Sequence, residues 1–366
     1  MCREETGWSC YPGPACAVLI FEVFCEFMDK SFKRLLIVSS DMSSHIPVSN
    51  CIESVSAGPI SPDVEWFRKI MSDCVLCPRA CHADRLSGGM GYCGQTADIM
   101  AARASLHYWE EPCISGTSGS GTVFFSGCNL RCVFCQNHNI ALGKAGRVIT
   151  PEHLVEIFLQ LQEQGANNIN LVTPTHFLPQ IVIALKQAKK QGLSIPIVYN
   201  TGSYESPEAL RHLEGLVDIY LPDLKYFSPD LSAAYSHAPD YFEVACDAIA
   251  EMYRQVGDPV IDSDTGLMQK GLIVRHLLLP GQTKDSKKIL RYLHETYGDH
   301  IYISIMNQYT PLPQVADIEA LNRTVTPEEY DRVLRFAERI GIERGFRQEG
   351  SAASESFIPE FDERGL

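Results

Sequence analysis

The sequence contains no segment typical of a membrane span and little positive charge. Its most apolar run near the start, residues 15–28, is shorter than the ~20 residues that a membrane-spanning helix needs, and Glu22 and Glu26 interrupt it. Only 31 Lys and Arg residues stand against 45 Asp and Glu residues, which gives a formal net charge of -14. A nucleic-acid-binding protein would show a basic face. We therefore expect an acidic, soluble protein that binds neither membranes nor nucleic acids.

Internal repeats and a secretory signal are also missing. No period of 20–50 residues recurs, which excludes a solenoid. A signal peptide would begin with a basic segment, whereas Arg3 is followed at once by two glutamates. A chain of 366 residues can bury about three-quarters of its unfolded surface and needs no disulfides. The sequence nevertheless has 14 cysteines. Seven of them form two groups with metal-like spacing, which predicts metal sites in a reducing compartment, the cytoplasm.

The tighter cysteine group has the spacing C-x3-C-x2-C and consists of Cys128, Cys132 and Cys135. It follows residues 122–125, a β-branched and aromatic segment that predicts a buried strand. Three thiolates can hold three irons of a [4Fe–4S] cluster, which normally takes four cysteines. The fourth iron would then be open to another ligand. The alternatives are a partial zinc site, with His138 as a fourth ligand, and reduced thiols in the core.

A second cysteine group comes earlier, at the spacing C-x2-C-x3-C-x11-C. Its members are Cys74, Cys77, Cys81 and Cys93. Glycines at 88, 89 and 91 would let the backbone fold tightly around a metal. Four thiolates can close a tetrahedral zinc site or hold a second iron–sulfur cluster, and ligand type alone fits both. The remaining alternative is a thiol-rich turn without a metal.

From residue 122 onward, apolar strands alternate with amphipathic helices, which is typical of βαβ units on a parallel sheet. Strands are predicted at 122–126, 168–173, 195–199, 216–221, 271–279 and 301–306. Helices are predicted at 151–164, 177–191, 207–214, 241–256, 285–297 and 327–340. Six such units favour an α/β fold with an incomplete (β/α)6 parallel barrel. The chain would comprise a leader and linker over 1–60, a small cysteine-rich N-terminal module over 61–115, the partial barrel over 116–343 and a flexible tail over 344–366.

Polar residues follow the predicted strands, or lie within the fifth of them in the case of Arg275 and His276, at the edge where parallel α/β folds bind their ligands. These residues are Thr173, Thr175, His176, Asn200, Thr201, Asp223, Lys225, Arg275, His276, Asn307, Gln308 and Tyr309. Each one alone also fits a capping or loop-stabilising role. Together they fall on the rim that carries the three-cysteine loop, which predicts a ligand site there.

The three-cysteine loop resembles that of the radical S-adenosylmethionine (SAM) superfamily, including Phe134 before the last cysteine and Asn137 soon after it. Residues 70–340 are similar to the branch that contains the pyruvate formate-lyase activating enzymes. The motifs that carry this likeness are Cys74-x-x-Cys77-Pro-Arg-x-Cys81, Gly121-Thr-Val-Phe-Phe-Ser, Asn170-Leu-Val-Thr-Pro-Thr-His, Val198-Tyr-Asn-Thr, Asp218-Ile-Tyr-Leu-Pro-Asp-Leu-Lys225 and Gly271-Leu-Ile-Val-Arg-His. The resemblance implies a [4Fe–4S] cluster on Cys128, Cys132 and Cys135 whose open iron binds SAM. It also implies reductive cleavage of SAM to methionine and a 5′-deoxyadenosyl radical, which removes a hydrogen atom from a substrate.

The chain departs from the activating enzymes at two motifs. They have Gly-Gly-Glu after the second strand, where this chain has Thr173-Pro-Thr175-His, and Asp-Thr after the third, where it has Asn200-Thr201. The resemblance implies that these residues form a modified SAM pocket. It places Lys225 and Arg275 near the SAM carboxylate, which positive charge complements, and leaves Asp223 for a cation or for substrate.

The resemblance implies a radical SAM enzyme that receives electrons from a flavodoxin or a ferredoxin. Three functions stay open on the sequence. The chain could install a glycyl radical on a partner enzyme, or act on a small molecule or peptide. It could also be a non-catalytic metal-binding protein that keeps the barrel.

Overall fold

The computed structural model of the chain describes residues 61–348 and 361–366 and the backbone of residues 8–10. Most of the predicted leader over 1–60, and residues 349–360 of the predicted tail, lie outside these residues. Within the described part of the chain, no helix is both long and apolar enough to cross a membrane.

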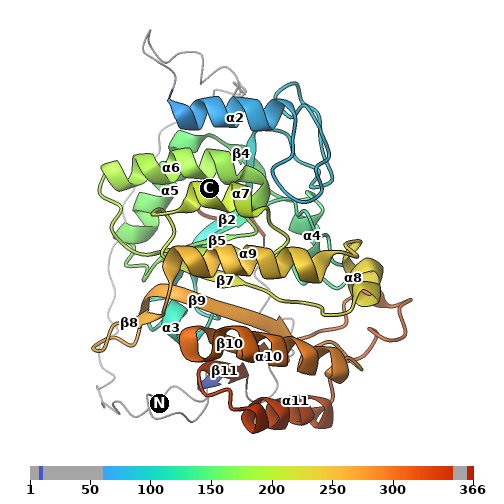
Figure 1. The fold of residues 1–366 in the computed structure, drawn as a ribbon. Helices are drawn as coiled ribbons and strands as arrows, with labels where there is room; N and C mark the ends of the chain where they lie inside the picture. Colours follow the sequence, from blue (N-terminus) through green and yellow to red (C-terminus); the bar gives the residue numbers. More distant parts are fainter. Residues whose placement is uncertain (1–7, 11–60, 349–360) are drawn as a thin grey trace, which may run out of the picture.

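One eleven-stranded sheet runs through the molecule (Figure 1). In spatial order its strands are β1 (Trp8–Cys10), β11 (Gly345–Gln348), β10 (Tyr302–Met306), β9 (Met268–Leu277), β7 (Ile219–Pro222), β6 (Ile197–Thr201), β5 (Ile169–Val172), β3 (Ser120–Phe125), β2 (Ile99–His107) and β4 (Arg147–Ile149), and β8 (Val260–Ile261) pairs with β9. From β3 to β11 every neighbouring pair is parallel. The six strands predicted from residue 122 onward are confirmed, because β3, β5, β6, β7, β9 and β10 lie side by side. An α/β fold with a parallel, incomplete barrel is therefore confirmed.

Helices connect the parallel strands and cover one face of the sheet (Figure 1). The helices are α2 (Pro62–Ser72), α3 (Pro112–Ser115), α4 (His138–Ala141), α5 (Pro151–Glu163), α6 (Leu178–Lys190), α7 (Pro207–Leu210), α8 (Pro229–Ser236), α9 (Tyr241–Val256), α10 (Thr283–Tyr297) and α11 (Pro327–Ile340). Thr150 caps α5, since its hydroxyl accepts a hydrogen bond from the His153 amide at 3.1 Å. Thr326 and Glu329 form a capping box at the start of α11.

Successive residues of each parallel strand face opposite sides of the sheet. On the outer face, which the helices cover, side chains such as Leu171, Tyr199 and Val274 belong to the main hydrophobic core. On the inner face, α3 and the strands β6, β7, β9, β10 and β11 form a smaller apolar cluster that includes Ile114 and Ile219. The inner face also carries polar residues, such as Asn170 and Asn200.

Five strands, β1, β2, β4, β8 and β11, lie where the sequence predicted no strand. β2 falls inside the predicted cysteine-rich module, yet it pairs antiparallel with β3 and belongs to the main sheet. Its alanine-rich sequence has no clear strand pattern, because alanine favours helices. β11 lies inside the predicted tail and β1 inside the predicted leader, and these two strands pair with each other. Strands of three or four residues are too short to show alternation in the sequence.

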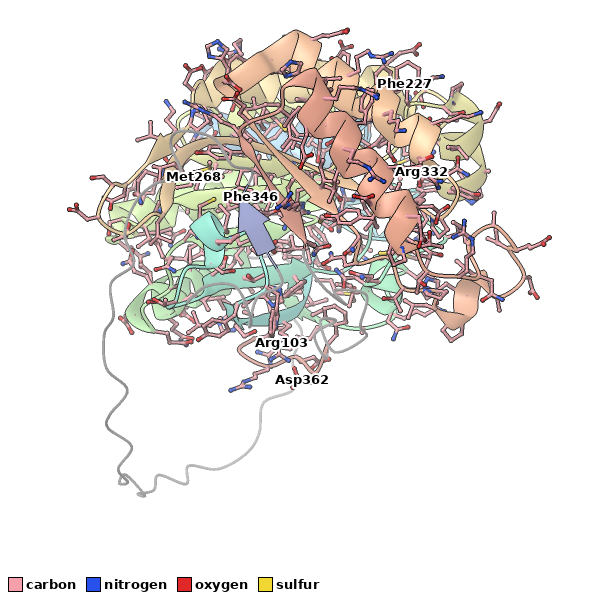
Figure 2. The ribbon with its side chains drawn as sticks, turned by 90° about the horizontal axis from the view of Figure 1, so that it is seen from below. Arg103, Phe227, Met268, Arg332, Phe346 and Asp362 are labelled. Carbon is pink, nitrogen blue, oxygen red and sulfur yellow. The ribbon has the colours of Figure 1, made fainter. Side chains whose placement is uncertain are left out.

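The last described residues return to the sheet beside β2. The Ala104 amide donates a hydrogen bond of 2.9 Å to the Arg364 carbonyl. Figure 2 shows Arg103 next to Asp362, with 2.9 Å between guanidinium and carboxylate. Phe361 packs edge-on against Phe124 of the inner face, with 5.4 Å between ring centroids. The C-terminal residues therefore contact the inner side of the partial barrel.

Candidate active site

The three-cysteine loop leaves the carboxyl end of β3 and brings its thiols together. Burial and the neighbouring Cys132 thiol raise the pKa of Cys128. Burial and then the thiols of Cys132 and Cys128 raise the pKa of Cys135 to about 12. Two sulfurs already accept hydrogen bonds, from the Leu130 amide to Cys128 Sγ at 3.3 Å and from Ser236 Oγ to Cys132 Sγ at 2.9 Å. The loop therefore gathers three free thiols in a desolvated place.

Aromatic side chains fix the end of this loop. Phe134 is buried, and the rings of Tyr226, Tyr235 and Tyr309 surround it edge-on at centroid distances of 6.3, 6.4 and 6.1 Å. The Gln314 amide donates a hydrogen bond of 3.2 Å to the Cys135 carbonyl. Packing and hydrogen bonding thus hold the loop from the β7 and β10 sides of the barrel.

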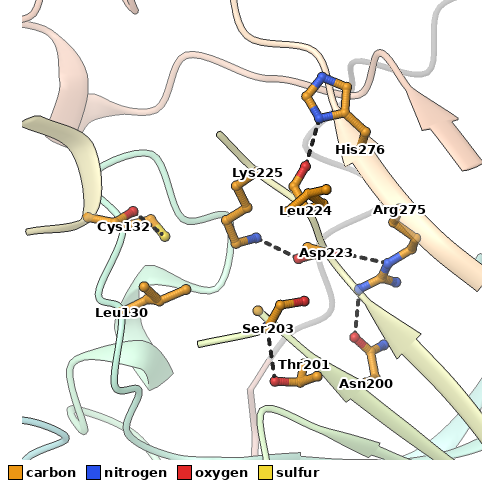
Figure 3. A network of polar contacts seen from close by, with 12 residues as sticks. Leu130, Cys132, Asn200, Thr201, Ser203, Asp223, Leu224, Lys225, Arg275 and His276 are labelled. Carbon is orange, nitrogen blue, oxygen red and sulfur yellow. Dashed lines mark hydrogen bonds and ion pairs between the residues drawn. The ribbon is translucent and has the colours of Figure 1, made fainter. Parts of the chain in front are cut away.

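Two cations share one carboxylate beside the loop (Figure 3). Asp223 accepts a hydrogen bond of 2.5 Å from Lys225 Nζ and one of 2.8 Å from Arg275 Nε. Arg275 continues to Glu110 at 3.1 Å and to the Asn200 side-chain oxygen at 2.6 Å. Three of the predicted SAM-site residues, Asn200, Lys225 and Arg275, therefore form one connected network.

The charges of this network are mutually stabilised. Burial alone would raise the pKa of Asp223, but Arg275 and Lys225 outweigh it and lower the pKa below its ordinary value. Burial alone would lower the pKa of Lys225, but Asp223 and then Cys132 raise it above its ordinary value. Asp223 and Lys225 are therefore both charged at neutral pH. Lys225 also lies close enough to Cys132 for the two groups to interact.

Thr175 and Thr201, which were predicted in the same site, belong to a different cluster. Their hydroxyls both donate to Glu205 Oε1, at 2.6 and 2.5 Å, and Tyr199 approaches the same atom at 3.4 Å. The hydroxyls lie on the outer side of the sheet because Thr201 follows Asn200 in the strand and faces the opposite way. The structure therefore separates the two threonines from the Lys225–Arg275 network.

Thr173, the third threonine of the predicted site, has an unusual backbone. Its φ is +56°, which is rare for a β-branched residue. Its amide donates to the Asn200 carbonyl at 2.9 Å, which continues the β5–β6 pairing by one residue. Strained residues of this kind persist where the surrounding structure holds them, often at functional sites.

The two predicted histidines hold the rim together. His176 Nε2 lies 2.6 Å from the Ser126 carbonyl, just before the cysteine loop, and burial lowers the pKa of His176 to about 3. His276 Nδ1 lies 2.8 Å from the Leu224 carbonyl. Both rings are buried. They therefore position the chain on either side of the Asp223–Lys225 segment and carry no charge at neutral pH.

Two glutamates, Glu110 and the fully buried Glu111, belong to the inner face, and neither is part of a motif in the sequence. Glu110 accepts hydrogen bonds from Asn170 at 3.0 Å and Asn200 at 3.3 Å, besides its contact with Arg275. Among the described residues, neither carboxylate oxygen of the fully buried Glu111 has a hydrogen-bond partner, and burial raises the pKa of Glu111 to about 7. The only local signal is the Glu-Glu-Pro sequence before α3, which also fits an ordinary helix start.

Comparisons with known proteins bear on the segment that builds this site. Residues 122–293 match the family model of the Radical SAM superfamily. An uncharacterized protein of Methanocaldococcus jannaschii is 26% identical over 304 residues, which cover 80% of this chain and 82% of the relative. A pyruvate formate-lyase-activating enzyme of Clostridium pasteurianum is 27% identical over 188 residues, which cover 49% of this chain and 70% of the relative. Among solved structures, a radical SAM methyltransferase from Sphaerobacter thermophilus aligns with a TM-score of 0.43 at 18% identity, over 64% of this chain and 69% of that one.

The matched segment begins in β3 and ends in α10. It therefore contains all three thiols of the loop, the Asp223–Lys225 segment and Arg275. With the parallel strands in the predicted order and the thiol loop at the end of the first of them, the geometry agrees with the similarity of residues 122–293 to the radical SAM superfamily.

Proposed function

We propose that the chain is a radical SAM enzyme in which Cys128, Cys132 and Cys135 hold a [4Fe–4S] cluster and Lys225 and Arg275 bind SAM. The observation that carries this proposal is the position of Lys225, which reaches Asp223 and is close to Cys132. A cation there complements a carboxylate bound next to the cluster. Asn200 and Thr173 complete the pocket on the β5 and β6 side.

The donor set fits such a cluster. Three thiolates on one loop can ligate three irons, and the hydrogen bonds from Leu130 and Ser236 are the kind that stabilise sulfur ligands and tune a cluster. When bound, the cluster and SAM supply a 5′-deoxyadenosyl radical that abstracts hydrogen from a substrate. The chain's own residues then have three tasks. Asp223 fixes the two cations, the aromatic residues around Phe134 shield the loop, and the inner face holds the substrate.

The experiment is SAM cleavage by protein reconstituted without oxygen. Wild-type protein loaded with iron and sulfide and reduced with dithionite should form 5′-deoxyadenosine and methionine. Cys132→Ala should form neither, because one of three cluster ligands is gone, and it should keep its fold because the apolar core holds the barrel. Cys246→Ala, a cysteine of α9 outside both groups, is the matched control and should cleave SAM. A loaded wild-type protein that forms no 5′-deoxyadenosine would leave only the non-catalytic, metal-binding function.

As the substrate, we propose a glycine residue of a partner glycyl radical enzyme. The similarity to the pyruvate formate-lyase-activating enzyme supports this choice, and a flavodoxin or ferredoxin would donate the electron. Electron paramagnetic resonance (EPR) on a candidate partner incubated with the reduced enzyme and SAM should show a glycyl radical. SAM cleavage without any radical on the partner would instead favour a small molecule or a peptide as substrate.

A further inference from the structure

The four cysteines of the N-terminal group lie in one folded loop between α2 and β2. Cys74 and Cys93 are buried, Cys77 is half-buried and Cys81 is exposed, and all four are free thiols. Cys93 is close enough to Cys74 and Cys81 to interact electrostatically with both. The loop thus gathers these cysteines although 19 positions separate the first from the last in the sequence.

The backbone of this loop is shaped around Cys81. Ala80 and His82, on either side of it, have φ values of +39° and +53°, which are uncommon for residues other than glycine. A Cβ atom on Gly91 would overlap Cys81 Sγ. A side chain at position 91 would therefore displace this sulfur, and the left-handed backbone on both sides of Cys81 is a conformation that persists only where the surrounding structure holds it.

A buried arginine accompanies the four thiols. Arg85 is 1% exposed, and its Nη1 lies 3.9 Å from Cys74 Sγ. Its other nitrogens donate to the Thr96 carbonyl at 3.2 and 2.6 Å. In the described part of the chain Arg85 makes no ion pair with a carboxylate. A buried guanidinium is costly without a counter-charge, and thiolates bound to a metal would supply that charge.

Four cysteines can hold either one zinc ion or an iron–sulfur cluster. Around one zinc ion the sulfurs lie ~2.3 Å from a common centre. Among the described residues no three His, Cys, Asp or Glu side chains converge on a point that one metal ion could occupy. This holds for the three-cysteine loop too, for which the family implies a [4Fe–4S] cluster. The larger volume of an iron–sulfur cube fits a group of sulfurs that lie near one another without meeting at one point.

The N-terminal group also touches the three-cysteine loop. Burial raises the pKa of the Cys77 thiol overall, but the Asn129 side chain, one residue after Cys128, is close enough to Cys77 to lower that pKa in part. A Cβ atom on Gly127, one residue before Cys128, would lie 2.9 Å from the Cys93 carbonyl. The N-terminal cysteine group therefore lies next to the three-cysteine loop, both just before and just after Cys128.

Arg79 ties the two loops together. It is the arginine of the Cys77-Pro-Arg-x-Cys81 motif, and its Nε donates to the Asn129 carbonyl at 2.8 Å. Its Nη2 donates to the carbonyl of Ser236 at 2.9 Å, and the Ser236 side chain in turn donates to Cys132. One side chain of the N-terminal loop thus positions residues on both sides of the other thiol group.

We propose that Cys74, Cys77, Cys81 and Cys93 hold a second [4Fe–4S] cluster, with all four irons ligated by the protein, next to the cluster of the three-cysteine loop. Because no iron of this second cluster is open, it does not bind SAM. The proposal goes beyond SAM cleavage and does not depend on it.

The deciding experiment removes the first site and counts what remains. The triple variant Cys128→Ala, Cys132→Ala, Cys135→Ala, reconstituted without oxygen, should hold about four irons and four sulfides per chain, against about eight of each in the wild type. Its reduced form should give an EPR signal that SAM leaves unchanged. Cys246→Ala should match the wild type in both counts. One zinc per chain, or no metal at all, in the folded triple variant would overturn the proposal.

A second measurement covers a triple variant that fails to fold. The iron content of the wild-type protein then decides, since about eight irons per chain support the proposal and about four overturn it. Cys77→Ala with Cys93→Ala gives the converse test. Its reduced protein should lose the SAM-insensitive signal and keep the signal that SAM changes. Retention of both signals in this double variant would contradict the assignment.

Discussion

On β6, Tyr199 faces the helices and its neighbour Asn200 faces the inside of the barrel, and their surroundings are opposite. Tyr199 packs against Tyr220 with 5.8 Å between ring centroids, inside the main hydrophobic core. Asn200 instead hydrogen-bonds to Arg275 and Glu110. A period of two along a strand thus lets the outer face stabilise the sheet while the inner face presents polar groups to a ligand. Outer-face substitutions should therefore change stability, and inner-face substitutions should change SAM binding.

The largest expected effect comes from cutting an outer-face side chain. Leu171 is fully buried among α5, α6 and the sheet, so Leu171→Ala should lower the free energy of unfolding by about 2–5 kcal/mol. Chemical denaturation measures this loss, and calorimetry without oxygen should find an unchanged Kd for SAM.

Asn170, the residue before Leu171 on β5, gives the matched control. Asn170 faces inward and donates one hydrogen bond to Glu110, so Asn170→Ala should cost only about 0.5–1.5 kcal/mol of stability. If Asn170→Ala and Leu171→Ala lost equal stability, the division between the two faces would be wrong.

The second-largest expected effect is on the affinity for SAM, and it tests whether Lys225 at the rim binds SAM. Lys225→Met removes a cation close to the proposed carboxylate site, but Asp223 keeps its partner Arg275. A hydrogen bond to a charged group contributes about 1.5–3 kcal/mol, so the Kd for SAM should rise about 10–100-fold. The free energy of unfolding should change little. Lys186→Met, which removes a surface ion pair with Asp63, is the control, and an equal Kd for Lys225→Met and wild type would remove Lys225 from the site.

The parts of this site that local motifs define could be predicted from the sequence, whereas the parts that tertiary contacts build could not. The thiol spacing lies within one loop, and the order of parallel strands brings Lys225 and Arg275 to one rim, so both could be predicted. Glu110 reaches Arg275 only because β2, which the sequence did not reveal as a strand, joins the sheet beside β3. No residue pattern encodes that pairing.

The separation of Asn200 from Thr201 could have been predicted. Neighbouring residues of a strand face opposite sides, so only one of the two can join an inner-face site. The sequence placed both in the SAM pocket because it ranked residues by their position at a strand end. The ranking did not use the alternation of side chains between the two faces of a strand.

The smallest expected effect concerns Glu205, the carboxylate to which the outer-face hydroxyls of Thr175 and Thr201 donate. Burial raises its pKa to about 7 from the ordinary value of 4.5, although the hydroxyls of Thr175, Thr201 and Tyr199 partly offset this. Between these two pKa values the unfolded chain releases the proton that the folded chain keeps. The free energy of unfolding should therefore fall as pH rises, by up to about 1 kcal/mol per pH unit, and below pH 4.5 Glu205 should add no pH dependence. Glu205→Gln keeps an acceptor for the threonines without a titrating group, so denaturation curves from pH 4.5 to 7 should lose this contribution to the slope. Glu163→Gln, an exposed change on α5, should retain the wild-type slope. Parallel curves for Glu205→Gln and wild type would mean that the buried carboxyl is charged throughout this range, and that the outer face tolerates a charge that its apolar packing should exclude.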